Sequence, residues 1–158
     1  MQINIAPVPS AFLARARNEG IDALGQPVRR VVAEGGEPCR DVLRRACVGE
    51  ELILASFSPF LEEGPYREFG PVFILADASG EEVPREVLPV SQPISQGYLR
   101  DRFVLRAYSP REEILDAAMV TPAEAEATIE SFLANPDVAF VHARFPLYGC
   151  FACRIDRA

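Results

Sequence analysis

The sequence contains no lysine and only one histidine, His142, and all 16 of its remaining basic residues are arginines. A Schiff base to an aldehyde or a pyridoxal cofactor requires a lysine amine. A phosphate-binding P-loop also requires its lysine, and a helical metalloprotease site requires two histidines four residues apart. None of these three kinds of site can be built from this chain.

Positive charge is also scarce overall, because 23 acidic residues outnumber the 16 arginines and give a net charge of −7. A negative field repels phosphate backbones and anionic lipid surfaces, so we expect neither nucleic acid nor a membrane as a partner. Residues 1–10 lack the features of a signal peptide, and the longest apolar runs, residues 52–57 and 138–141, are too short to cross a bilayer. These absences favour a soluble, cytoplasmic protein.

The cysteines are few and unevenly placed at Cys39, Cys47, Cys150 and Cys153, so we expect free thiols and not a disulfide framework. Cys150 and Cys153 match the CxxC spacing of redox and zinc sites. They fall in an expected strand, however, where residues three apart face opposite sides of the sheet. Their sulfurs then cannot converge on one ion. We expect two small buried residues here, with no metal site and no cofactor.

Most segments alternate between apolar and polar residues, as half-buried strands do. The length of 158 residues predicts a single domain, residues 1–158. A short helix is expected over residues 11–18, whereas residues 39–47 fit either a helical turn or irregular chain. Strands are expected over residues 2–8, 28–33, 51–57, 71–76, 102–108, 113–120, 138–144 and 150–156. We predict an α+β fold with a mainly antiparallel sheet and one long and one short helix packed on it.

The long helix has the clearest signal in the chain. Thr121-Pro122-Ala123-Glu124 is a capping box with proline at the first helical position. The threonine and the glutamate of such a box each bind a backbone N–H group that the helix leaves free. Asn135-Pro136 marks the end of the helix. One apolar stripe is expected between these signals, formed by Ala125, Ile129, Phe132 and Leu133.

The last two expected strands would form a hairpin around a loop at residues 145–149. In that register Arg144 lies opposite Cys150, and His142 lies opposite Ala152. A histidine, a thiol and two guanidinium groups on one face would form a small-anion site or a thiol–histidine site. The alternative is that His142 is a core histidine that is hydrogen-bonded to the backbone. One face of this hairpin carries His142, Arg144, Cys150 and Arg154, and the other carries Val141, Ala143, Phe151 and Cys153.

Two other segments present side chains that suit anions. Cys39 and Arg40 follow a glycine pair, so their backbone can approach another group closely, and the arginine would favour the thiolate. Tyr66 and Arg67 lie in a long connection rich in aromatic residues and would offer a phenol and a guanidinium to a ligand. The structural alternatives are a buried thiol beside an exposed arginine, and a tyrosine that anchors its loop.

Short motifs are spread in order along nearly the whole chain: Pro38-Cys39-Arg40 with Leu43, Gly49-Glu50, Pro65-Tyr66-Arg67, Gly70-Pro71-Val72-Phe73, Leu105-Arg106-Ala107-Tyr108, Ala139-Phe140-Val141-His142-Ala143 and Gly149-Cys150-Phe151-Ala152. Together they resemble an uncharacterised bacterial family, the domain of unknown function 1203. The resemblance implies no activity and no catalytic residue, because that family has none assigned. Relatives tend to read His-Asn where this chain has Arg144-Phe145, and some carry a polar residue in place of Leu75. If relatives use that polar pair, this member has lost or altered the function.

Two hypotheses of different classes follow for a protein whose function the sequence leaves unknown. The first is a protein without catalysis that binds a small molecule, above all a small anion, or associates with a second copy as a homodimer. The second is a small enzyme with Cys39 or Cys150 as nucleophile and His142 as base. We favour the first, because nothing in the sequence pairs a nucleophile with a base. Its candidate ligand-binding residues are Arg40, Tyr66, Arg67, Arg144 and Arg154.

Overall fold

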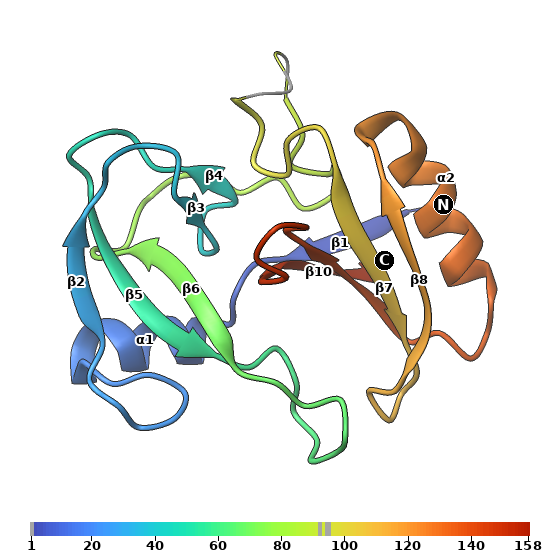
Figure 1. Ribbon diagram of the computed structural model, residues 1–158, viewed down its shortest axis with the longest axis horizontal. Helices are drawn as coiled ribbons and strands as arrows, with labels where there is room; N and C mark the ends of the chain where they lie inside the picture. Colours follow the sequence, from blue (N-terminus) through green and yellow to red (C-terminus); the bar gives the residue numbers. More distant parts are fainter. Residues whose placement is uncertain (1, 92, 94–95) are drawn as a thin grey trace.

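The computed structural model describes residues 2–91, 93 and 96–158, and this part of the chain forms two sheets with one helical segment against each. The expected mixed α+β architecture, mainly sheet, is confirmed. The expectation of a single sheet is wrong. Alternation identifies which segments are strands, but it does not specify which strands pair. Figure 1 shows the two sheets side by side, with the β3–β4 and β9–β10 regions facing each other between them.

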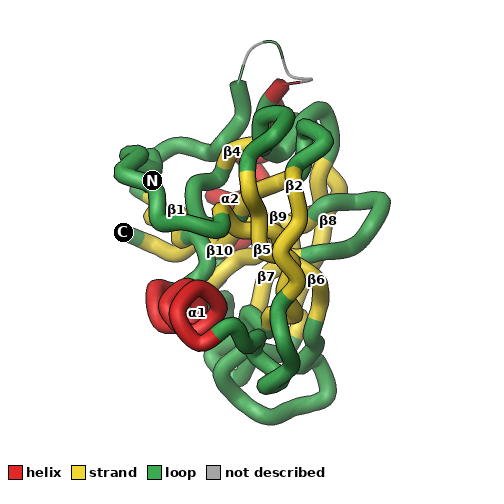
Figure 2. Tube along the Cα trace, turned by 90° about the vertical axis from the view of Figure 1, so that its left-hand side faces the viewer, coloured by secondary structure: helices red, strands yellow, loops and turns green. Residues whose placement is uncertain are grey.

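The first sheet is antiparallel throughout and joins the two ends of the described chain. Its N-terminal strand pairs with its C-terminal one, so that Ile3 lies opposite Arg157, and Figure 2 shows both ends on the same side of the molecule. The strand order is β1 (Ile3–Ala6), β10 (Phe151–Arg157), β9 (Phe140–Arg144), β7 (Phe103–Tyr108) and β8 (Ile114–Val120).

The second sheet is mixed, because β3 runs parallel to β6 where Cys39 lies opposite Phe73. Residues 39–47, which the sequence left ambiguous, form the tight hairpin of β3 and β4 and the turn between them. The short helix α1 (Ser10–Ala14) continues as a π-helical segment, Arg15–Glu19, and Phe12 packs against Phe57 of this sheet. The strand order is β2 (Arg29–Val32), β5 (Glu51–Phe57), β6 (Gly70–Leu75), β3 (Pro38–Cys39) and β4 (Arg44–Arg45).

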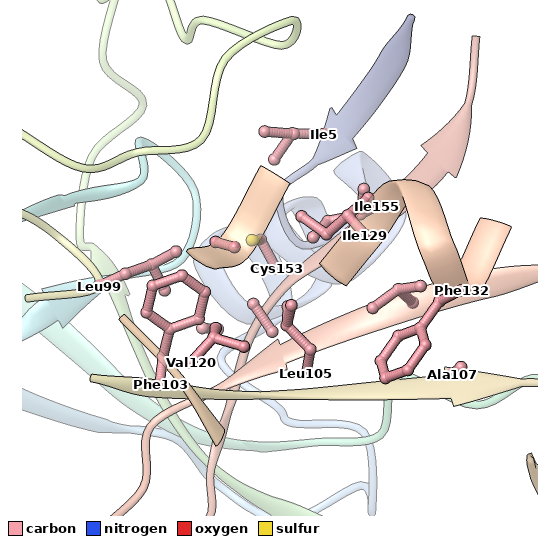
Figure 3. Close-up of a cluster of buried hydrophobic side chains, with 14 of the residues drawn as sticks. Ile5, Leu99, Phe103, Leu105, Ala107, Val120, Ile129, Phe132, Cys153 and Ile155 are labelled. Atoms are coloured by element: carbon pink, nitrogen blue, oxygen red, sulfur yellow. The ribbon is translucent and has the colours of Figure 1, made fainter. Parts of the chain in front are cut away.

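The core of the first sheet lies between its outer face and helix α2 (Pro122–Ala134). The predicted stripe of Ala125, Ile129, Phe132 and Leu133 is the buried side of that helix. Figure 3 shows the Cys153 sulfur among the apolar side chains of this cluster. Cys153 is fully buried, and burial raises the pKa of its thiol to about 12, so it is a core residue as expected.

The capping box of α2 forms as predicted. The Glu124 carboxylate accepts hydrogen bonds from the Thr121 backbone N–H and hydroxyl, both at 2.8 Å. We expect Thr121→Ala to lower the free energy of unfolding by about 1 kcal/mol, because the cap stabilises the first turn. Urea unfolding measures this loss, with Thr128→Ala, the same truncation at a half-buried position inside the helix, as a control. An unchanged stability would show that α2 is held by packing alone.

The hairpin of β9 and β10 has a different register from the expected one. Arg144 lies opposite Phe151 and His142 opposite Arg154, because a β-bulge at Ala152 shifts the pairing. Outside partners use the backbone carbonyls of this bulge: the Tyr98 hydroxyl donates to the Ala152 carbonyl at 2.9 Å, and Arg40 Nε donates to the Phe151 carbonyl at 2.9 Å. The bulge therefore docks β10 onto neighbouring segments as well as onto β9.

The shifted register changes which side chains share a face. Phe151 now lies on the face of His142, where the two rings are 5.1 Å apart, and not beside Cys153 as expected. From this face Phe151 packs into the core of the second sheet, where its ring is 5.5 Å from Phe57. Phe151 is thus an apolar link between the sheets. Cys150 precedes the strand and does not occupy the predicted position opposite Arg144.

No helix in residues 2–91, 93 and 96–158 is long and apolar enough to cross a membrane.

Candidate functional site

A cavity of about 570 Å³ lies where the two sheets meet, within the usual size range of small-molecule sites. Four regions supply its walls: the chain around β3 and β4, strand β6, the segment before β7, and the loop between β9 and β10. The apolar part of the wall includes Phe73, Leu99 and Phe145, and the basic part is Arg40, Arg45, Arg100 and Arg102. Three acids, Glu34, Glu37 and Asp101, also line it.

Arg40 is the most deeply buried of the basic residues, with 3% of its surface exposed. Its backbone N–H donates to the Phe73 carbonyl, which extends the pairing of β3 with β6 and directs the side chain into the cavity wall. Its Nε donates to the Phe151 carbonyl at 2.9 Å and its Nη1 to the Pro38 carbonyl at 2.7 Å. These acceptors are neutral, so the charge of Arg40 is held in place without being neutralised.

Arg45 is held in the same way, by carbonyls only. Its guanidinium donates to the carbonyls of Gly36, Gly97 and Tyr98 at 2.6 to 3.2 Å. Burial lowers the pKa of Arg45 to about 10, and the positive charge of nearby Arg100 acts in the same direction. The three backbone carbonyls fix the side chain, while desolvation and the second guanidinium work against its charge.

Phe145 lies against the buried guanidinium of Arg40 and the half-buried guanidinium of Arg45. The Cζ atoms of Arg40 and Arg45 are 5.0 and 5.5 Å from the centre of its ring. Cation–π contact of this kind orients the planar groups and stabilises their charge to a small extent. Tyr98 meets the same ring edge-on at 5.3 Å, although it does not itself line the cavity.

The acids of the cavity do not form ion pairs with these arginines. The Glu37 carboxylate accepts hydrogen bonds from the backbone N–H groups of Glu34 and Gly35, at 2.7 and 3.0 Å, and these bonds stabilise the loop before β3. Glu34 and Asp101 are exposed. Among the described residues, no ion pair joins Arg40, Arg45 or Arg100 to a carboxylate. The cavity therefore has an excess of unneutralised positive charge along one wall.

The glycine pair before β3 gives the cavity its shape on that side. Gly35 and Gly36 have φ angles of +106° and +95°, which other residues rarely adopt. A Cβ atom at Gly36 would lie in ordinary contact, 3.5 Å from an Arg100 nitrogen, so the backbone angle and not space favours glycine here. Arg100 itself has an unfavourable positive φ of 57°. Such strain in a non-glycine residue often marks a functional segment.

A second cavity of about 190 Å³ adjoins the first and shares Pro71, Tyr148 and Cys150 with it. Arg144 lines this second cavity and is 3% exposed. Its Nη1 donates to the Gly149 carbonyl at 2.8 Å. Its Nη2 forms an ion pair with Glu68 from the aromatic connection, the segment between β5 and β6. Its Nε is buried without a hydrogen-bond partner. Arg144 and Cys150 thus share a cavity, although their backbone pairing differs from the predicted one.

His142 lies outside both cavities and is fully buried. Its ring is enclosed by four aromatic rings, those of Phe60, Tyr108, Phe140 and Phe151, at 4.8 to 5.4 Å. The alternative of a core histidine is thus correct in its burial but wrong in its bonding, because neither ring nitrogen has a hydrogen-bond partner among the described residues. Burial lowers the pKa of His142 to about 3, and it cannot act as a base from this enclosed position.

The remaining predicted site residues are spread over the molecule. Cys39 is fully buried, and burial raises the pKa of its thiol to about 12, so it does not supply a nucleophile. Tyr66 and Arg67 are exposed in the aromatic connection and line neither cavity. Arg154 pairs with Asp156 at 2.8 Å and lies 3.8 Å over the ring of Phe140. Of the predicted residues, the cavities bring together Arg40, Arg144 and Cys150.

Sequence reasoning missed Arg45, Arg100 and Phe145 as parts of the site. The one available signal was the glycine pair Gly35-Gly36, which indicated a close backbone approach near Arg40. Nothing local distinguishes Arg45 from the other arginines, because two of its three carbonyl partners lie about fifty residues away in sequence. No group of three or more histidine, cysteine, aspartate or glutamate residues within the described ranges could hold a metal ion.

Comparisons with known proteins give one match. The family model described as a protein of unknown function (DUF1203) matches residues 36–157. The matched segment includes every residue of the two cavities except Glu34 and Gly35. No curated protein and no solved structure matches the chain.

Proposed function

Because the chain belongs to the DUF1203 family, whose function is unknown, we propose a function from the site itself: reversible binding of a small organic anion between the two sheets. One observation carries this proposal. Arg40 and Arg45 are held by carbonyls, lie beside Arg100, and have no carboxylate partner in the described chain. A carboxylate or phosphate in the cavity would supply the missing negative charge and accept hydrogen bonds from guanidinium groups already in position.

The rest of the wall indicates the other half of the ligand. Phe73, Leu99 and Phe145 provide apolar and aromatic surface on the wall of the cavity, which has a volume of about 570 Å³. Such a wall favours a ligand with a flat or apolar body attached to its acidic group. Side chains fixed before binding lose little conformational entropy when the ligand enters. We therefore expect aromatic carboxylates to bind better than inorganic anions of the same charge.

The arrangement does not favour catalysis by a thiol and a histidine. That hypothesis needs the imidazole beside a thiol and open to a pocket, whereas His142 is sealed among four aromatic rings. The binding function is the simpler inference, because it uses only the groups that line the cavity. A reducing, cytoplasmic location would suit it, since all four cysteines are free and Cys47 is exposed.

A thermal-shift titration tests the proposal with benzoate and phenyl phosphate as anionic probes and benzamide as the uncharged control. We expect both anions to raise the melting temperature and benzamide to leave it unchanged. Arg100→Gln should weaken anion binding about tenfold, as expected for the loss of one charged hydrogen-bonding partner. Arg111→Gln is the matched control, because Arg111 is exposed in the turn between β7 and β8 and lines neither cavity.

Two results would contradict anion binding at this site. One is an equal response to benzamide and benzoate, which would show that charge is irrelevant. The other is an equal loss of affinity in Arg100→Gln and Arg111→Gln, which would show that only the net charge of the protein matters. Raising the salt concentration should weaken binding to the wild type, since Arg100 is exposed to screening ions.

A further inference from the structure

Cys150 is the one thiol of the described chain that lines the cavities. It contributes to both of them and is only half-buried. It is a free cysteine, and its thiol donates a hydrogen bond to the Tyr148 carbonyl at 3.6 Å. Cys39 and Cys153 are fully buried, and burial raises the pKa of each thiol to about 12. A reagent that enters the cavities therefore meets one accessible sulfur.

A second, independent observation indicates a ligand at the same place. The Arg144 side chain is 3% exposed, lines the smaller cavity with Cys150, and has an Nε–H group without an acceptor in the part of the chain that the structure describes. A buried donor that lacks an acceptor costs free energy, which an acceptor atom of a bound molecule would recover. The chain fixes this side chain next to the thiol, because Nη1 donates to the carbonyl of Gly149, the residue before Cys150.

We propose that Cys150 is a site of covalent modification by negatively charged organic disulfides, of which oxidised glutathione is the simplest biological example. The proposal rests on the anion-binding function above, since the arginines of the larger cavity would hold the acidic groups of the disulfide. The disulfide bond would then lie at the wall that the two cavities share, where Cys150 is placed. The product is a mixed disulfide that fills the anion site.

The reaction is a thiol–disulfide exchange and needs no other oxidant. Cys150 loses its proton to solvent, and its thiolate attacks one sulfur of the disulfide. A new S–S bond forms to Cys150 while the S–S bond of the reagent breaks. The departing sulfur leaves with the electron pair and takes a proton from solvent, so Cys150 is oxidised and one half of the reagent is reduced. Arginine charge along the cavity raises the local concentration of an anionic reagent.

Paired rate measurements with two aromatic disulfides test the proposal. Dithionitrobenzoate carries two carboxylates, and dithiodipyridine is its uncharged counterpart. Cys47→Ser leaves Cys150 as the only accessible thiol, and Cys150→Ser leaves the exposed Cys47, which lines neither cavity. We expect the ratio of the anionic to the neutral rate constant to be about tenfold higher at Cys150 than at Cys47. The ratio cancels differences in exposure and in thiol reactivity.

Arg100→Gln in the Cys47→Ser background should lower the ratio towards that of Cys47, whereas Arg111→Gln should leave it unchanged. Wild-type protein treated with oxidised glutathione provides a check that needs no variant. Peptide mapping by mass spectrometry should find the glutathionyl group on Cys150 before it appears on Cys47. Equal ratios at the two thiols, or earlier modification of Cys47, would overturn the proposal.

Failure of this inference can be distinguished from failure of anion binding. Cys150→Ser keeps all the arginines, so benzoate should still raise its melting temperature. If benzoate stabilises Cys150→Ser but the two thiols show equal rate ratios, the anion site stands and the modification site is wrong. If benzoate stabilises neither Cys150→Ser nor the wild type, the binding function is wrong, and the modification proposal that rests on it is overturned too.

Discussion

Acidification from neutral pH to about pH 4.5 is expected to cost the wild-type protein about 3 kcal/mol more stability than it costs a His142→Leu variant. The pKa of His142 is about 3 in the folded protein, against 6.5 for an ordinary histidine. Between these two pH values, His142 is protonated in the unfolded chain but not in the folded protein. Stability is therefore complete above about pH 6.5 and falls with pH until the folded pKa is reached.

The physical cause is the aromatic enclosure of the imidazole. Burial is the main reason for the lowered pKa of His142, and the positive charges of Arg154 and Arg106 add to it. No carboxylate or carbonyl of residues 2–91, 93 and 96–158 accepts a hydrogen bond from either ring nitrogen, so an added proton would be buried without a partner. Over the range from pH 6.5 to pH 3 the expected loss is about 4 kcal/mol.

Urea unfolding at neutral pH and at about pH 4.5 measures the effect in both proteins. His142→Leu keeps the volume and removes the unpartnered nitrogens, so we also expect it to be at least as stable as wild type at neutral pH. His142→Gln is the companion variant: it keeps polar atoms in the cage but does not titrate. If wild type and both variants lose stability equally on acidification, the folded protein protonates His142 freely and the enclosure is not closed.

Arg40→Met is expected to lower the free energy of unfolding by about 3 kcal/mol or more. The substitution removes two charged hydrogen bonds, to the carbonyls of Phe151 and Pro38, and the contact with the Phe145 ring. It leaves a buried carbonyl of the Ala152 bulge region without its donor. Because Arg40 follows β3 and Phe151 begins β10, the loss falls on the junction between the sheets.

Arg40→Lys separates charge from geometry in this prediction. A lysine restores the positive charge, but its single nitrogen cannot reproduce the fixed Nε and Nη1 positions, so we expect only part of the stability to return. Chemical unfolding measures all three proteins, with the exposed Arg111→Met expected to stay within about 0.5 kcal/mol of wild type. A cost below about 1 kcal/mol for Arg40→Met would show that the two sheets are held together by apolar packing alone.

Local pattern predicted the individual elements well. The strand at residues 51–57 has the expected bounds as β5, and the capping box and apolar stripe identified α2. The structure of residues 39–47 could not be predicted, because β3 and β4 are only two residues long and so short a strand shows no alternation of apolar and polar residues. Their hairpin exists because of long-range partners, such as the Phe73 carbonyl that accepts from the Arg40 backbone.

The candidate site was harder to predict than the elements, because its geometry depends on one inserted residue. An alternating strand without a bulge would place Cys150 opposite Arg144, as the sequence suggested. Because of the bulge at Ala152, Phe151 lies opposite Arg144 instead. The carbonyls of Ala152 and Phe151 accept hydrogen bonds from Tyr98 and Arg40. No short-range signal marks this bulge, since its donors lie more than fifty residues away in the chain. The thiol and the arginine still share a cavity because both border the same loop.

The pairing of β1 with β10 has a consequence for how the chain is made. Residues 3–6 leave the ribosome before their neighbours in the sheet, residues 154–157, which emerge only after about one hundred and fifty further residues have been added. During that time the edge of the nascent β1 has no partner strand, and Ile5 has no core to enter. The second sheet uses only residues 29–75 and can assemble meanwhile. Synthesis therefore imposes an order on folding in which the half that carries both chain ends forms last.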